Sequence, residues 1–205
     1  MIDDELRAIA ARTKGFLPED EAAALHEAGL RGAPHGPLLE VGSYCGLSAI
    51  HLGAAAREHG TVLLTIDHHR GSEETQPGWE HHDPDVVDPR TGRMDTLPFL
   101  RRTLEEAGLE DVVVPIIGDS PTIAPLIRDG LGLVFIDGGH ALDVAMADYD
   151  AWAGHVASGG LLAIHDVFED PAQGGQAPFD VWRRAVADGF QPRSTHGSLR
   201  VLTCP

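Results

Sequence analysis

Short apolar runs alternate along the chain with longer segments in which apolar residues recur at helical spacing. Runs this short, bounded by turn residues, are typical of strands that are buried on both faces of a sheet. The runs that we interpret as strands lie at residues 38–41, 61–66, 112–117, 131–136, 161–164, near 190 and at 199–203. The predicted fold class is therefore α/β, a doubly wound, mostly parallel seven-stranded sheet with helices on both faces.

The segments between these runs predict helices, which cover residues 3–12, 19–29, 48–58, 97–107, 121–129, 141–155 and 179–188. Pro18 and the acids that follow it are typical of a helix start, because acidic side chains favour the positive end of the helix dipole. Gly108 is a typical helix stop. The chain shows no internal repeat, so we expect one domain over residues 1–205, with an N-terminal helical segment over residues 1–32.

The longest stretch without a regular pattern lies at residues 68–93, where prolines, glycines and histidines gather. Long loops inside compact domains are usually functional or disordered. We interpret this stretch as a lid-like insertion. The alternatives are a disordered polar insertion and direct metal binding by the pairs His68–His69 and His81–His82. The linker at residues 13–17 either lies over a site or is a plain connector.

Composition limits the partners. The 205 residues include 32 acidic and 15 basic ones, a formal net charge of −17, which repels the phosphates of nucleic acid. No apolar run approaches the roughly 20 residues that cross a bilayer. The acidic N-terminus is unlike a signal peptide, and two cysteines predict neither a disulfide framework nor a zinc motif. We therefore expect a cytoplasmic protein without nucleic acid or membrane partners, and a homodimer is one candidate for its oligomeric state.

Each of the first five predicted strands ends at or near an acid. These acids are Glu40, Asp67, Asp119, Asp137 and Asp166. In an open parallel sheet, ligands bind at the carboxyl ends of the strands. One acid there needs no functional explanation, but five that converge on one edge repel one another unless cations or hydrogen-bond donors balance them. The sequence therefore predicts a ligand site at this edge.

The first strand runs into the motif Glu40-x-Gly42-x-x-x-Gly46 and then into a helix. Such a strand, turn and helix cradle an adenosine-containing cofactor in many α/β folds. The glycines allow a sharp turn and let a ligand approach without meeting a Cβ atom. The candidate cofactor contacts in this stretch are Glu40, Gly42, Ser43, Gly46 and Ser48.

Two further strand ends carry candidate cofactor contacts. Asp67 lies 25 residues after Gly42, the spacing at which a carboxylate after the second strand accepts ribose hydroxyls; a turn aspartate is the alternative. His68 beside it is a further candidate. Asp119 and Ser120 are placed to meet an adenine amino group and its neighbouring ring nitrogen, unless Asp119 only caps the next helix.

The order of these residues resembles a class I S-adenosylmethionine-dependent methyltransferase, and the similarity covers residues 38–205. The resemblance implies the Rossmann-like version of the predicted sheet and S-adenosylmethionine as cofactor. The main rival is a nicotinamide-dependent dehydrogenase, which normally shows Gly-x-Gly-x-x-Gly. Here Ser43, Tyr44 and Cys45 stand between the two glycines, which favours the methyltransferase.

The segments 135–140 and 164–166 resemble the small metal-dependent O-methyltransferases that act on macrolide sugars and related natural products. The resemblance implies that Asp137 and Asp166 bind a divalent metal, Mg²⁺ or Mn²⁺, and that His140 is the general base. Asp137 is also a candidate cofactor contact. The chemistry agrees, because a cation held by carboxylates stabilises a developing alkoxide and a histidine takes its proton. The alternative for His140 is a helix-start histidine bonded to a carbonyl.

The chain departs from this family at His165, where the family has a second acid beside Asp166. Imidazole is a poor ligand for Mg²⁺ but is accepted by Mn²⁺, Zn²⁺ or Fe²⁺. His165 is therefore a candidate metal ligand, a second candidate base or a substrate contact.

The order of residues 67–74 also resembles an actinobacterial methyltransferase group that includes the mycobacterial 1-O-methyltransferase of methylmannose polysaccharide synthesis, which implies a partly methylated mannoside. We expect metal-assisted methyl transfer to a hydroxyl of a saccharide or glycosylated small molecule, with Trp79 stacking on a sugar face. A catechol, phenol or polyketide acceptor is less favoured, because only 5% of the residues are aromatic and few rings could sandwich a planar acceptor. Two functions of a different class stay open from sequence, an NAD(P)-dependent oxidoreductase and a non-catalytic adenosine-binding module.

Overall fold

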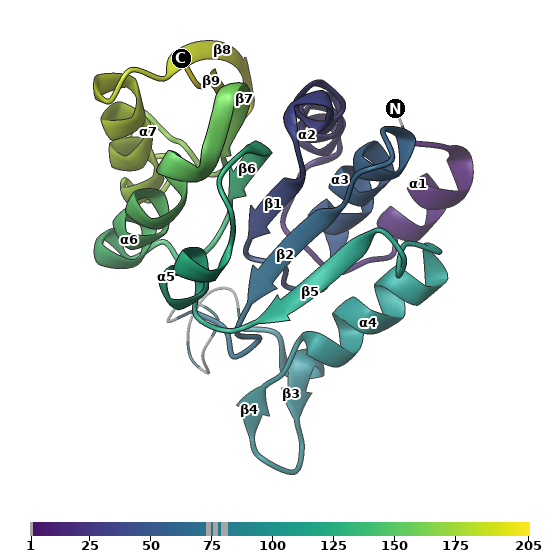
Figure 1. Ribbon diagram of the computed structural model, residues 1–205. Helices are drawn as coiled ribbons and strands as arrows, with labels where there is room; N and C mark the ends of the chain where they lie inside the picture. The colour runs from purple at the N-terminus through teal and green to yellow at the C-terminus, as the bar shows by residue number, and fades with distance from the viewer. Residues whose placement is uncertain (1, 73–74, 76–77, 79–81) are drawn as a thin grey trace.

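The centre of the molecule is a seven-stranded sheet with the order β5-β2-β1-β6-β7-β9-β8 (Figure 1). Figure 1 shows the computed structural model, which describes residues 2–72, 75, 78 and 82–205. The strands are β1 (Leu38–Val41), β2 (Leu63–Asp67), β5 (Val113–Ile117), β6 (Leu131–Ile136), β7 (Val156–Ile164), β8 (Gln191–His196) and β9 (Leu199–Thr203). β9 pairs antiparallel with β7 and β8, and the other pairings are parallel. The predicted α/β sheet is confirmed.

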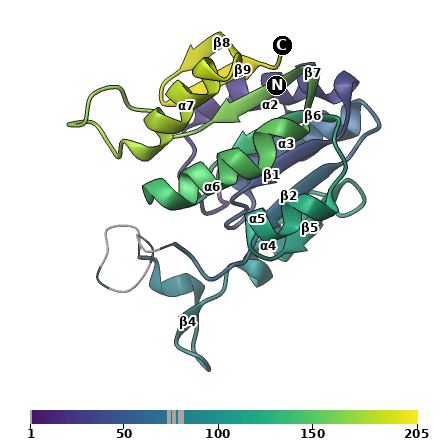
Figure 2. The same cartoon turned by 60° about the vertical axis from the view of Figure 1, so that its left-hand side comes forward.

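Helices cover both faces of the sheet (Figures 1 and 2). On one face lie α1 (Asp4–Ala10), α2 (Glu19–Gly32), α3 (Leu47–Glu58) and α4 (Leu97–Glu106), and on the other α5 (Ser120–Ile123), α6 (Leu142–Trp152) and α7 (Ala177–Ala187). Neighbouring strand residues point to opposite faces. Leu38 accordingly packs in the first core cluster and Leu39 in the second. None of the helices in the described part of the chain is long and apolar enough to cross a membrane.

Two elements differ from the prediction because of proline and glycine. The helix predicted at 121–129 is only α5 followed by a 3₁₀ turn, η4 (Ala124–Leu126), because Pro125 has no N–H to continue the α-helical ladder. β7 begins at Val156, before the predicted start at residue 161. Gly159 and Gly160 lie inside this strand, near the shift in β6–β7 register, and glycines are typical of such irregularities.

The predicted insertion at residues 68–93 is partly regular. It contains the 3₁₀ turn η3 (Pro84–Val86) and a small antiparallel sheet of β3 (Val87–Asp88) and β4 (Arg93–Met94), which projects from the body of the molecule in Figure 1. Val86 and Met94 are buried together with Cys45. The base of the insertion therefore packs on the turn that follows β1. The predictions for Trp79 and His81 lie outside the described residues.

Candidate active site

The ends of four central strands lie side by side. Backbone hydrogen bonds continue just past the strands, with the amides of Gly42, Asp137 and His165 donating to Ile66, Val41 and Ile136, respectively, at 2.9–3.1 Å. The strand-end acids of β1, β2 and β6 and the pair His165–Asp166 after β7 therefore share one edge of the sheet. This is the edge at which the sequence predicts a ligand site.

The turn between β1 and α3 can be built only with glycine at its key positions. Gly42 and Gly46 have φ values of 98° and 94°, in the left-handed region that side chains disfavour. A Cβ atom on Gly42 would lie 2.0 Å from the backbone oxygen of Asp137. At Gly46 it would lie 2.8 Å from Leu100 Cδ1. The turn is thus pressed against the end of β6, directly at the start of a helix.

Replacing Gly42 with alanine should destabilise the protein far more than the same change at Gly130. Both glycines have positive φ, 98° and 94°, but a Cβ on Gly130 meets nothing within 4 Å. Backbone strain costs roughly 1–2 kcal/mol at either site, and overpacking against Asp137 adds about 1–3 kcal/mol at Gly42 alone. Urea unfolding followed by circular dichroism measures both variants, and an equal loss of stability in the two would contradict the close packing of this turn.

Glu40 is a buried acid whose two oxygens differ in their hydrogen bonding. Its side chain is 0% exposed, Oε2 accepts a hydrogen bond from the Thr65 hydroxyl, and Ser43 Oγ in turn bonds Thr65. Within the described residues, Oε1 has no partner of good hydrogen-bond geometry. Burial raises the pKa of Glu40 to about 7, against the opposing effect of the nearby Ser48 and Thr65 hydroxyls. A cationic group beside the turn would therefore find a matched acceptor here.

Asp67 ties the turn to the insertion. Its two carboxylate oxygens accept the backbone N–H groups of Tyr44 and His69, at 2.9 and 2.7 Å. Each oxygen keeps a further lone pair for a ligand. The exposed His68 differs, because its Nδ1 accepts the Arg70 amide at 3.0 Å and so bonds its own loop.

The two candidate adenine contacts after β5 both make hydrogen bonds to other side chains of the protein. Asp119 Oδ2 accepts the Thr122 hydroxyl at 2.8 Å, and Ser120 Oγ accepts the indole N–H of Trp152 at 2.7 Å. Asp119 is exposed and Ser120 half-buried. The Asp119 side chain makes no capping bond to the helix backbone, so the simple cap that sequence left as the alternative is not formed.

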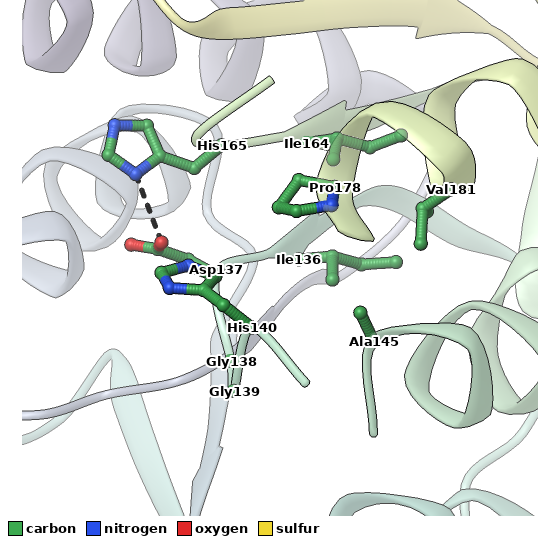
Figure 3. A pocket seen from close by; sticks show the side chains of 10 residues that line it. All are labelled: Ile136, Asp137, Gly138, Gly139, His140, Ala145, Ile164, His165, Pro178 and Val181. Carbon is green, nitrogen blue, oxygen red and sulfur yellow. Dashed lines mark hydrogen bonds and ion pairs between the residues drawn. The ribbon is translucent and has the colours of Figure 1, made fainter. Parts of the chain in front are cut away.

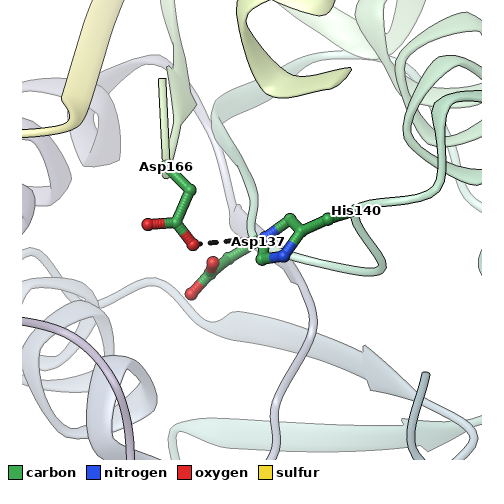
Figure 4. Close-up of side chains that lie close together, drawn as sticks. All are labelled: Asp137, His140 and Asp166. Atoms are coloured by element: carbon green, nitrogen blue, oxygen red, sulfur yellow. Dashed lines mark ion pairs between the residues drawn. The ribbon is translucent and has the colours of Figure 1, made fainter. Parts of the chain in front are cut away.

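Asp137, His140 and Asp166 form a compact group at the ends of β6 and β7 (Figure 4). One potential ligand atom from each residue lies within 4.8 Å of the others. Nε2 of His140 is 3.2 Å from Oδ2 of Asp166, and each of the three side chains is between 23% and 31% exposed. Two carboxylates and an imidazole are a donor set that Mg²⁺ or, with the nitrogen, Mn²⁺ accepts. Asp166 adopts φ 54°, in the left-handed region that residues other than glycine seldom adopt.

His165 is bonded at both ring nitrogens. Nδ1 bonds Asp137 Oδ1 at 3.0 Å, the interaction drawn as a dashed line in Figure 3, and Nε2 lies 2.8 Å from Oε2 of Glu21. Burial lowers the pKa of His165, but the charges and hydrogen bonds of Asp137 and Asp166 outweigh it and raise the pKa to about 11. A carboxylate on each side of the ring favours the form of His165 that is protonated at both nitrogens.

Its place beside Asp166 predicts that His165 is a metal ligand, a second base or a substrate contact. The three side chains whose potential ligand atoms lie within 4.8 Å of one another are Asp137, His140 and Asp166. The same interactions lower the pKa of Asp166, because the bonds from His140 and His165 outweigh the burial that would raise it. An ionised Asp166 is what a metal ligand requires.

A profile of a family described as "Methyltransferase domain" matches residues 39–167, from near the start of β1 to just beyond Asp166. The match covers more than half of the chain. The protein belongs to this methyltransferase domain family. The assignment decides between the methyltransferase and the nicotinamide-dependent dehydrogenase that the glycine turn alone had left open.

Solved structures with the same fold include several O-methyltransferases. The O-methyltransferase NovP has 15% identity and a TM-score of 0.68, over 90% of this chain and 79% of that one. TomG from Streptomyces achromogenes, involved in tomaymycin synthesis and solved in complex with SAM, has 19% identity and a TM-score of 0.63, over 100% of this chain and 92% of that one. An O-methyltransferase from Bacillus cereus in complex with SAH has 17% identity and a TM-score of 0.64, over 99% of this chain and 92% of that one. At these identities the likeness shows the shared fold alone.

A small pocket of the methyltransferase domain borders the three-residue group (Figure 3). Asp137, His140 and His165 form its polar side, and α6 and α7 close the other side with Ala145 and Val181. The lining residues are Ile136, Asp137, Gly138, Gly139, His140, Ala145, Ile164, His165, Pro178 and Val181. Charged groups therefore stand against an apolar wall at this edge of the sheet.

The linker before α2 contacts the glycine turn and the insertion. Lys14, the single lysine of the chain, places Nζ 2.6 Å from Asp83 Oδ2 and 2.9 Å from Asp85 Oδ2. These bonds raise the pKa of Lys14, those to Asp83 most. The rings of Phe16 and Tyr44 lie 5.5 Å apart. The linker thus bridges the glycine turn and the insertion.

Sequence reasoning missed one residue of the site, Glu21 of α2. By sequence it is one of the acids that favour a helix start, and nothing local assigns it a further role. It is 5% exposed and reaches His165 from the far end of the chain. The signal was available in the helical pattern, because Glu21 and Leu25 lie four residues apart on the buried face. An acid on an apolar helix face calls for a partner.

Proposed function

We propose that this methyltransferase transfers a methyl group from S-adenosylmethionine to a hydroxyl group of a saccharide or glycosylated small molecule, with the help of a divalent metal. One observation carries the proposal. The group of Asp137, His140 and Asp166 lies at the same edge of the sheet as the glycine turn and the buried Glu40. Cofactor contacts and proton-transfer groups are thereby brought to the same strand ends.

The residues of the turn fit the cofactor. Oε1 of Glu40, which has no partner of good hydrogen-bond geometry among the described residues, suits the ammonium of the methionine part. Gly42 and Gly46 leave backbone without Cβ atoms where the cofactor would lie. Asp67 has lone pairs left for the ribose hydroxyls, and Asp119 and Ser120 would meet the adenine. The SAM and SAH complexes of TomG and the Bacillus cereus enzyme, which share the fold, support this choice of cofactor.

The acidic group fits a divalent metal. We propose Asp137 and Asp166 as its ligands, because their carboxylate oxygens suit Mg²⁺ and Mn²⁺ alike. A cation at this position would orient the acceptor hydroxyl and stabilise negative charge that develops on its oxygen.

His140 is the proposed general base. The acceptor oxygen forms a bond to the methyl carbon while the bond from that carbon to the positively charged sulfur breaks, leaving a neutral thioether. The hydroxyl proton passes to the His140 imidazole. Asp166, 3.2 Å from Nε2, stabilises the positive ring that results. His165 is already doubly bonded to carboxylates and keeps a structural position beside Asp137.

The acceptor class rests on the chain's own sequence. Few aromatic residues, 5%, are present to sandwich a planar ring. The order of residues 67–74, with its resemblance to the methylmannose polysaccharide group, favours a partly methylated mannoside methylated at position 1. A panel of mannosides and phenols with labelled S-adenosylmethionine tests this choice, and methylation of phenols alone would overturn it.

Calorimetry with S-adenosylhomocysteine tests the proposed cofactor. The unsubstituted protein should bind it with a micromolar dissociation constant, and Glu40→Gln should bind it more weakly because the buried negative charge is lost. NAD(H) serves as the control ligand and should give no heat. The absence of binding at sub-millimolar S-adenosylhomocysteine would contradict the proposal.

Loosening the linker should weaken substrate binding more than turnover. In Lys14→Met the two ion pairs to the insertion are lost, and partly exposed pairs contribute up to about 1 kcal/mol, so KM should rise up to about fivefold with kcat nearly unchanged. Arg12→Met is the matched control, because it removes a pair 2.8 Å from Glu106 on α4 instead. Equal KM values in the two variants would contradict a lid held by Lys14.

A further inference from the structure

A chain of hydrogen bonds connects the N-terminal helical segment to the proposed metal ligands. Glu21 of α2 bonds Nε2 of His165 at 2.8 Å, and Nδ1 of His165 bonds Asp137 Oδ1 at 3.0 Å and lies 3.4 Å from Asp166 Oδ2. Glu21 and His165 are 5% and 3% exposed. The imidazole therefore stands between one buried carboxylate and the two carboxylates of the site.

The position of the Glu21 carboxylate is fixed from a second direction. Ser198, in the turn between β8 and β9, donates its backbone N–H to Oε1 at 2.8 Å and its hydroxyl to Oε2 at 3.0 Å. At Gly197, with φ 51°, a Cβ atom would lie 2.1 Å from Oε1. The turn between β8 and β9 thus closes around Glu21, which leaves its Oε2 directed at the ring.

We infer that Glu21 is a positioning residue for the transfer centre, because it holds the His165 ring in the orientation that directs Nδ1 at Asp137 and Asp166. This inference rests on the proposed function of those two aspartates. The backbone of His165 is tied to Ile136, but its ring can still turn about the side-chain bonds. Without Glu21, the N–H at Nε2 would be buried with no acceptor. Leaving a buried donor unpaired costs more free energy than the hydrogen bond itself contributes.

Electrostatics makes the orientation matter. Asp137 and Asp166 end neighbouring strands, and two carboxylates so close repel each other. Nδ1 of the His165 ring faces both carboxylates, at 3.0 Å from Asp137 Oδ1 and 3.4 Å from Asp166 Oδ2. Residues that orient the ligands of a metal usually alter metal affinity or activity by about 10- to 100-fold when they are changed. Glu21 and Ser198 lie outside residues 39–167, the part that matches the family, so this support is supplied by the flanks of the domain.

The test compares Mn²⁺ affinity, by calorimetry without cofactor or acceptor, in Glu21→Gln and two controls. Glu21→Gln keeps the shape of the side chain but places an amide against donors, and Mn²⁺ affinity and kcat should each fall about 10- to 100-fold, with KM for S-adenosylmethionine unchanged. Glu19→Gln makes the same change on an exposed neighbour in α2 and should leave both unaltered. Ser198→Ala removes the hydroxyl contact with Glu21 but leaves its bond to His165.

The outcomes separate positioning from simple anchoring of α2. Mn²⁺ affinity in Glu21→Gln equal to that in Glu19→Gln would overturn the inference, as would the same loss in Ser198→Ala. If Glu21→Gln does not fold, Glu21→Asp replaces it, because this change keeps the charge and shortens the reach toward His165. Failure of the proposed metal centre is distinguishable: the unsubstituted protein would then bind no Mn²⁺, which overturns the inference as well.

Discussion

Replacing Asp137 with asparagine is expected to lower kcat by about 1,000-fold or more. Asp137 contributes to the three-residue group and accepts the His165 ring at 3.0 Å. Charge stabilisation by a bound metal contributes several kcal/mol to a transition state, and each 1.36 kcal/mol is a factor of ten in rate. The neutral amide keeps the size of the side chain but loses the charge that holds the cation.

The matched control for this change is Asp143→Asn, which alters an exposed acid at the start of α6 without touching the group. Its kcat should equal that of the unsubstituted enzyme. EDTA should likewise abolish transfer in the unsubstituted enzyme, and Mg²⁺ or Mn²⁺ should restore it. Full activity of Asp137→Asn, or activity that chelation leaves unchanged, would show that transfer proceeds without a metal at Asp137.

Replacing His140 with alanine is expected to lower kcat by about 100- to 10,000-fold, the usual contribution of a positioned general base. S-adenosylhomocysteine affinity should stay the same, because His140 is not among the proposed cofactor contacts. Mn²⁺ affinity should also stay within about threefold, since the base leaves its metal-binding neighbours Asp137 and Asp166 in place. The control is His196→Ala, an exposed histidine on the edge strand β8.

Two results would change the role of His140. A large loss of Mn²⁺ affinity would make it a metal ligand, as its place in the group of three also allows. Turnover retained in His140→Ala would remove it as the base and direct attention to His165. The two variants His140→Ala and His165→Asn, measured side by side, separate these roles through kcat and Mn²⁺ affinity together.

The sequence predicted the parts of the molecule that depend on local pattern. The central strands are apolar runs covered on both faces, so their existence and the acids at their ends could be read directly. Residue 125 is a proline, and it shortened the helix predicted at 121–129. The hairpin β3–β4 could not be foreseen, because its two-residue strands are too short to leave a periodic signal.

The contacts that decide the role of His165 depend on the tertiary fold. From sequence, His165 stands next to Asp166 and resembles a ligand position. The fold brings Glu21 to its Nε2 from 144 residues away, and no local spacing encodes that pairing. Lys14 is similar, because its partners Asp83 and Asp85 lie in the insertion. Sequence reasoning therefore identified the site, whereas the partner of each group came from the packing of distant segments.

Crystals grown with S-adenosylhomocysteine and Mn²⁺, and measured at the manganese absorption edge, test the central claim most directly. We predict one anomalous peak bound by carboxylate oxygens of Asp137 and Asp166, with S-adenosylhomocysteine lying along the turn from Gly42 to Gly46. A manganese peak elsewhere, such as on the histidines of the insertion, or no peak at saturating Mn²⁺, would contradict it.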